Sequence, residues 1–122
     1  MIYLKGRDDG TTNIFISDLN IINESDSNKE ALKIESCNFH TRNINIKNFH
    51  IGYNLINCNT VNIESNYISL PFSLNKIPVR AVIFTTCKSI ILQNNKIIFE
   101  SALDFERIRK NRLVKFTSRT QY

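Results

Sequence analysis

The stretch GYNLINCNTVNIESNYIS, Gly52–Ser69, holds apolar residues that alternate with polar residues in short runs. Leu55, Val61, Ile63 and Ile68 are spaced too irregularly for an amphipathic helix. Polar residues also interrupt them too often for one long strand. Alternation over three to five residues instead predicts several short strands. The fold must therefore be one that can use strands of this length.

The same short pattern recurs along the chain. The segments NIFISDLNI, NINIKNFHI, TVNIESNYI and SIILQNNKI align with three apolar columns and one small polar column. The inward columns are expected to be Ile14, Ile44, Val61 and Ile90; Ile16, Ile46, Ile63 and Leu92; and Ile21, Ile51, Ile68 and Ile97. The polar column is Asp18, Asn48, Ser65 and Asn94. Because such residues tolerate a left-handed backbone or bond their own backbone, we expect a sharp corner there.

A further strand precedes three of these segments, and each copy ends in a cysteine. Its inward pairs are expected to be Leu32 and Ile34, Tyr53 and Leu55, and Val82 and Phe84. Strands this short are stable when stacked coils pair each strand with its equivalent and bury a continuous apolar column. The alternative, a β-sandwich, would need hairpin signals, and Asp9-Gly10 is the one such pair, ahead of the repeats. The sequence therefore predicts an all-β fold, a parallel β-helix.

Length and charge suggest how the chain is organised. A chain of 122 residues predicts one domain, residues 1–122, with coils over about 11–100. After Phe99 the pattern changes, and Ser101 could cap a helix. We expect residues 101–122 to form a helical or irregular segment that caps the last coil. Much of the net charge of +5 lies in this segment, which could contact a partner, but no aromatic stacking motif supports nucleic-acid binding.

Several site classes find no support in the sequence. Cys37, Cys58 and Cys87 lack zinc-ligand spacing, so neither a metal site nor a disulfide framework is predicted, and no cofactor is expected. No apolar run approaches the roughly 20 residues of a membrane span. The start, MIYLKGRDDG, lacks the long apolar centre of a signal peptide.

Three segments carry a family resemblance: ALKIESCNFHTRNINIKNFHI, GYNLINCNTVNIESNYIS and RAVIFTTCKSIILQNNKIIF. They resemble coils of right-handed parallel β-helix proteins of the pectate lyase and polygalacturonase type, which include phage tailspike depolymerases. The resemblance implies a single-stranded right-handed β-helix of about four coils and an extracellular, cell-surface or virion location. It also implies a carbohydrate groove beside Leu32–Glu35, Tyr53–Ile56 and Val82–Thr85.

The resemblance also suggests site residues. Polygalacturonases place an acid pair, a histidine and a basic residue on this face in that chain order, which implies catalytic roles for Glu30, His50 and Arg80. The motifs differ, because Lys29-Glu30 replaces Asp-Asp, HIG replaces His-Gly, RAV replaces Arg-Ile-Lys, and no Asn-Thr-Asp segment is present. The expected substrate-binding residues are Lys29, Lys33, Glu35, Tyr53 and Asn54.

Loops and polar residues near these strands add two expectations. The linkers Asn23–Glu30 and Pro71–Val79 should flank a low notch, since only Gly52 intervenes between the coils that they border. His40 and Arg42, next to Phe39, could contact a sugar or a phosphate, or simply decorate a turn.

Two function classes remain open. The first is a carbohydrate-directed β-helix that binds a polysaccharide or oligosaccharide or degrades it, as a glycoside hydrolase or a polysaccharide lyase. The second is a non-catalytic structural or assembly β-helix, such as a segment of a virion or surface fibre, that forms a homotrimer or joins a larger β-helix. Hydrolysis would need Glu30, His50 and Arg80 to converge with a second carboxyl at about 5–9.5 Å from the first.

Overall fold

A computed structural model describes residues 1–25, 29–72 and 78–100 of the chain. The expected cap over 101–122 lies outside these described residues. Every regular element within them is a β-strand, and no helix there is long and apolar enough to cross a membrane. The strands are β1 (Ile2–Lys5), β2 (Asn13–Ile22), β3 (Glu30–Glu35), β4 (Asn38–Lys47), β5 (Ile51–Ile56), β6 (Thr60–Glu64), β7 (Tyr67–Leu70), β8 (Arg80–Thr85), β9 (Ile90–Gln93) and β10 (Lys96–Phe99).

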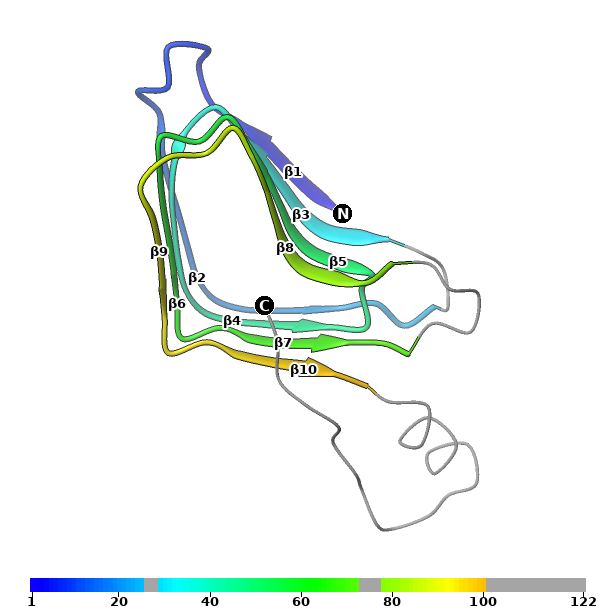
Figure 1. Cartoon of the computed structure of the whole chain (residues 1–122). Coiled ribbons are helices and arrows are strands. Elements are labelled where there is room, and N and C mark those ends of the chain that lie inside the picture. The colour runs from blue at the N-terminus through cyan, green and yellow to red at the C-terminus, as the bar shows by residue number, and fades with distance from the viewer. Residues whose placement is uncertain (26–28, 73–77, 101–122) are drawn as a thin grey trace, which may run out of the picture.

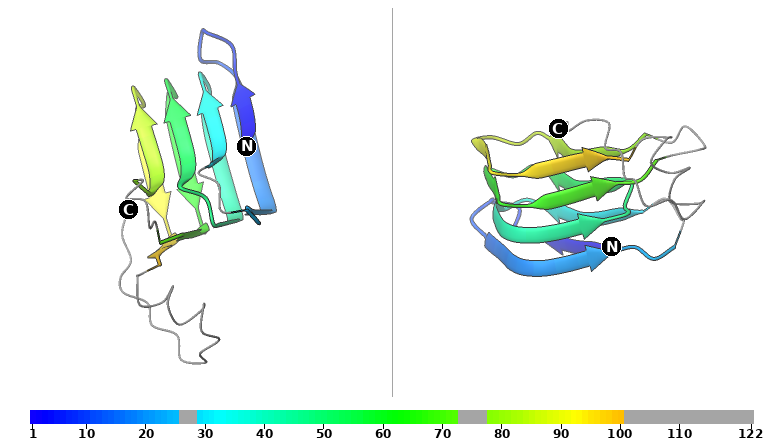
Figure 2. Two further views of the ribbon diagram at one scale, coloured as in Figure 1. Left: turned by 90° about the vertical axis from the view of Figure 1, so that its right-hand side faces the viewer. Right: turned by 90° about the horizontal axis from the view of Figure 1, so that it is seen from below.

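The strands form three walls around one core, as the view along the stack in Figure 1 shows. The first wall is the sheet β1-β3-β5-β8, whose strands lie side by side in Figure 2. The second wall contains β9, β6 and the first halves of β4 and β2, and the third contains β10, β7 and the second halves of β4 and β2. All pairings are parallel, which confirms a parallel β-solenoid. Four stacked strands in the first wall define about three turns, slightly fewer than the four coils expected.

The alignment predicted for the first wall is confirmed. Leu32 pairs with Tyr53, which pairs with Val82 in the next turn, and the column of Ile34, Leu55 and Phe84 follows the same register. The stack begins earlier than the expected start near residue 11, because β1 pairs with β3 and adds Ile2 and Leu4 to these columns.

The alignment predicted for the second wall is wrong in one segment. Phe39, rather than Ile44, lies between Ile14 and Val61 in the inward column. Ile44 and Ile46 belong to the third wall, and Ile46 pairs there with Ile21 and Ile68. Ile51, expected in that last column, lies in the first wall.

The misalignment has a physical cause in Thr41. This fully buried residue occupies the inward column between Ile16 and Ile63, where the pattern predicts an apolar side chain. Two corners in this turn, at Asn43 and Asn48, also look alike, and both have positive φ angles, 57° and 65°. The corner equivalent to Asp18 is Asn43, whose side-chain Nδ2 donates a hydrogen bond to Asp18 Oδ1 at 2.7 Å.

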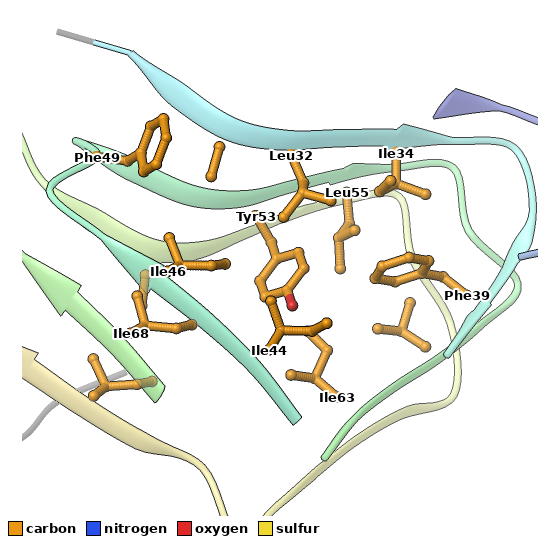
Figure 3. Packing of buried hydrophobic residues seen from close by; sticks show 14 of the residues in the cluster. Leu32, Ile34, Phe39, Ile44, Ile46, Phe49, Tyr53, Leu55, Ile63 and Ile68 are labelled. Atoms are coloured by element: carbon orange, nitrogen blue, oxygen red, sulfur yellow. The ribbon is translucent and has the colours of Figure 1, made fainter. Parts of the chain in front are cut away.

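The core is a continuous apolar column enclosed by the three walls. Figure 3 shows side chains from all of them pointing toward one another. Left-handed corners allow the chain to turn within one residue while the strands keep their inward alternation. The corner residues after β3, β5 and β8 are Ser36, Asn57 and Thr86, and the corners into the third wall are Asp18, Asn43, Ser65 and Asn94.

Candidate functional site

The outer face of the first wall carries most of the predicted binding residues. Tyr3, Lys33 and Asn54 are in register on three neighbouring strands and alternate with inward core residues. Adjacent strands lie about 4.8 Å apart, so these side chains form a short row. The Lys33 ammonium lies 5.3 Å from the centre of the Tyr3 ring and 3.7 Å from Glu35 Oε1. Tyr3, which the sequence reasoning missed, is 49% exposed.

Glu30 belongs to the same row through a hydrogen bond. Asn54 Nδ2 donates to Glu30 Oε1 at 3.1 Å and lies 3.4 Å from Oε2. The carboxylate and the amide therefore hold each other in place. Because these two side chains are already ordered, a ligand that binds them pays a smaller entropy cost.

The three predicted catalytic residues are neighbours in the backbone but do not form a cluster of side chains. Ile51 pairs with both Glu30 and Arg80, and the Arg80 N–H donates to the His50 carbonyl at 2.8 Å. His50 is buried, while Arg80 is exposed. Within the described ranges, no hydrogen bond or ion pair joins the side chains of Glu30, His50 and Arg80.

The carboxylates of the first wall come from the two ends of one strand. The four strands of this wall contain two carboxylates, Glu30 and Glu35, at opposite ends of β3. Their backbone positions are about 16 Å apart along the strand. The side chains lean toward each other, because Glu30 accepts from Asn54 and Glu35 lies 3.7 Å from Lys33, which is in register with Asn54. Elsewhere in the described part of the chain, His, Cys, Asp and Glu residues do not gather in groups of three or more that could hold a metal ion.

Tyr53 is a core residue and does not reach the face where it was expected to bind substrate. Its side chain is fully buried, because strand alternation turns it inward between Leu32 and Val82. Its hydroxyl lies 3.2 Å from Thr41 Oγ1 and donates a hydrogen bond to Asn66 Oδ1. Burial raises the pKa of Tyr53 above its ordinary value, so the phenol keeps its proton.

The predicted notch can be described only in part. The middle of each flanking linker, 26–28 and 73–77, lies outside the described residues. Between the linkers, Gly52 is tightly packed, since a Cβ placed there would lie 2.5 Å from the Ala81 carbonyl oxygen. A close backbone approach therefore requires glycine at this position.

A second polar face lies on the second wall. Phe15, His40 and Asn62 are in register and point outward, and Arg42 is paired with Glu64 in the next column. The rings of Phe15 and His40 meet edge to face, with centres 4.7 Å apart. His40 Nε2 lies 3.6 Å from Glu64 Oε2. His40 and Arg42 thus lie within β4 rather than in a turn.

Comparison with protein-family models, with curated proteins and with solved structures found no match to this chain. The likeness to pectate lyases and polygalacturonases therefore rests on the coil pattern alone, and that pattern specifies coil geometry rather than chemistry.

Proposed function

We propose that this protein is a carbohydrate-binding β-solenoid that holds an extended polysaccharide along the outer face of the first wall without cleaving it. One observation carries the proposal: the row of Tyr3, Lys33 and Asn54 across three successive strands. An exposed aromatic ring offers an apolar surface to the apolar face of a sugar, and its hydroxyl adds a polar contact. The ammonium and the amide beside it supply hydrogen bonds to sugar hydroxyls.

The contacts around the row suit binding. Glu30 accepts from Asn54, and Glu35 lies 3.7 Å from Lys33, so both carboxylates already hold the side chains that face the ligand. Lys29 and Arg80 flank the start of the strands and extend the polar surface beyond the row. Basic and acidic groups alternate on this face, which favours a neutral or weakly acidic polysaccharide.

The test is a screen of neutral and acidic polysaccharides in which binding, new reducing ends and unsaturated products are measured separately. We expect binding to at least one polymer with neither kind of product. Tyr3→Ala and Asn54→Ala should each weaken that binding about tenfold, equivalent to about 1.4 kcal/mol. Lys47→Ala, which changes an exposed residue on the third wall, is the matched control and should bind normally.

Three results would contradict the proposal. Release of either product would show that the protein is an enzyme. Equal binding by the Tyr3→Ala and Lys47→Ala variants would show that the row does not contact the polymer. Absence of all polysaccharide binding would remove the carbohydrate class itself.

One observation favours the alternative, a structural or assembly solenoid. In the described part of the chain, β9 is at the edge of its sheet and leaves Ile90, Ile91 and Leu92 between 39% and 47% exposed. An unpaired edge with apolar side chains can pair with another chain. Concentration-dependent association in sedimentation, together with no polysaccharide binding, would support this alternative.

A further inference from the structure

We infer that the second wall carries a separate ligand site, a groove beside His40 that takes a hydroxylated saturated ring such as a sugar or cyclitol ring. This inference is independent of the proposed function, because the groove lies on another wall and shares no residue with the row of Tyr3, Lys33 and Asn54. The site is built from side chains of three successive turns, on β2, β4 and β6.

The groove runs between two outward columns of side chains. Its volume is about 350 Å³, near the lower end of the range of roughly 300–1,000 Å³ that is typical of small-molecule sites. Columns two residues apart on one face of a strand are separated by about 7 Å, which leaves room for one ring between them. One column is Asn13, Asn38 and Thr60, and the other is Phe15, His40 and Asn62.

Two polar atoms in the second column lack the partners that buried polar atoms normally have. Asn62 Oδ1 and His40 Nε2 are shielded from solvent, and neither makes a hydrogen bond with the described residues, although Glu64 Oε2 lies 3.6 Å from the His40 nitrogen. The facing column differs, because Asn38 Nδ2 donates to Asn13 Oδ1 at 3.1 Å and lies 3.4 Å from the Gly10 carbonyl oxygen. Leaving buried polar atoms unpaired costs stability, so their position at one groove points to a ligand that pairs with them.

A hydroxyl is the group that fits these atoms. It donates one hydrogen bond and also accepts, so it can donate to the Asn62 oxygen while it accepts from the His40 ring N–H. An ionised carboxylate has no hydrogen to donate to Asn62 Oδ1, and an ammonium has no lone pair with which to accept from His40.

The rest of the groove supports an uncharged ring. Phe15 is 55% exposed and held edge to face against His40, so it presents apolar surface to the groove. Glu64 lies 3.6 Å from His40 Nε2 and is in register with Arg42, which balances the charges beside the site. A saturated ring with hydroxyls on its edge and an apolar face matches this combination.

Two sources of such a ring are possible: a free monosaccharide or cyclitol, and the terminal unit of an oligosaccharide. The test follows amide chemical shifts of the full chain during titration with methyl hexosides and with myo-inositol, then with oligosaccharides that end in the responding sugar. We expect saturable shifts confined to residues 13–15, 38–42 and 60–64. Equal affinity for glycoside and oligosaccharide would identify the single ring as the ligand, and tighter oligosaccharide binding would identify a chain end.

A matched pair of variants separates ligand binding from a structural role. Asn62→Val removes the unpaired oxygen in the groove, and we expect at least tenfold weaker ring binding with no loss of thermal stability. Asn45→Val also removes a buried, unpaired amide oxygen, but on the third wall, and should leave ring binding unchanged. Tyr3→Ala should also leave it unchanged, which distinguishes this site from the polysaccharide row.

Two outcomes would overturn the inference. If none of the rings produces saturable shifts in the groove, no site of this kind exists. If Asn62→Val lowers the melting temperature while ring binding persists, Asn62 has a structural role and the ligand assignment is wrong.

Discussion

The phenol hydroxyl of Tyr53 donates a hydrogen bond to Asn66 Oδ1 in the middle of an otherwise apolar core. Thr41 Oγ1 lies 3.2 Å from the same hydroxyl. Asn66 donates from Nδ2 to the Glu64 carbonyl at 2.7 Å and accepts at its own backbone carbonyl from the Lys96 N–H at 2.9 Å. The Asn66 N–H donates to Asn95 Oδ1 at 2.9 Å. This polar chain links three successive turns, because Thr41, Tyr53 and Asn95 belong to different ones.

We predict that Tyr53→Phe lowers the free energy of unfolding by about 1–3 kcal/mol, because it leaves the buried Asn66 oxygen without its donor. The ring itself and its packing against Phe39 are kept. Urea denaturation measures the change. Tyr3→Phe is the matched control, since Tyr3 is 49% exposed and its hydroxyl can be replaced by water. An equal effect of the two substitutions would contradict a structural role for the buried chain.

The alternation of apolar and polar residues was enough to predict the solenoid and the first wall. Leu32, Tyr53 and Val82 occupy one column because each follows the same short strand pattern, and period-two alternation fixes which face is inward. The second wall was misaligned because Thr41 is a buried polar residue in an inward column. A polar side chain can be buried in the core when a residue of another turn forms a hydrogen bond with it. The spacing of residues along the sequence does not show which residue that is.

The candidate site was less predictable than the fold. Lys33 and Asn54 follow from the outward positions of strands already recognised, whereas Tyr3 joins their row only because β1 pairs with β3 across a long sequence separation. Phe15 and Asn62 were missed for a similar reason: they meet His40 only when β2, β4 and β6 are in their true register. Their outward positions would have placed them beside His40 if these strands had been aligned correctly.

A second prediction concerns the corner at Thr86. This β-branched residue has a φ of 55°, a conformation that L-residues other than glycine, asparagine and aspartate adopt at a cost of roughly 1–2 kcal/mol. The equivalent corner one turn earlier is Asn57, with the same φ. We therefore expect Thr86→Asn to raise the free energy of unfolding by about 0.5–1 kcal/mol.

The neighbouring threonine provides a control of opposite sign. Thr85 lies in β8, paired with Ile56, where a β-branched residue suits the strand. Thr85→Asn should therefore lower the denaturation midpoint while Thr86→Asn raises it. If both substitutions shift the midpoint in the same direction, backbone strain at Thr86 is not what limits stability.

The last prediction concerns stability at alkaline pH and depends on Cys37. Burial raises the pKa of this fully buried thiol from 9.0 to about 12, and the nearby Cys58 adds to the effect. An unfolded thiol loses its proton near pH 9, while the folded one keeps it, so the folded state binds more protons between these values. Stability should therefore fall as pH rises above about 9, by at most about 1.4 kcal/mol per pH unit for one thiol.

Urea denaturation at intervals from pH 8 to pH 10.5 measures this slope. Cys37→Ala should make this fall shallower, because it removes one thiol with a raised pKa. The small cavity that it leaves lowers the free energy of unfolding equally at every pH and so does not change the slope. Burial also raises the pKa values of Cys58 and Tyr53, so part of the slope should remain. Cys87→Ala alters a partly exposed thiol that adds only a smaller part of the raised pKa values of Cys37 and Cys58, so it should reduce the slope less than Cys37→Ala does. A slope unaltered by Cys37→Ala would mean that this thiol titrates alike in the folded and unfolded chains.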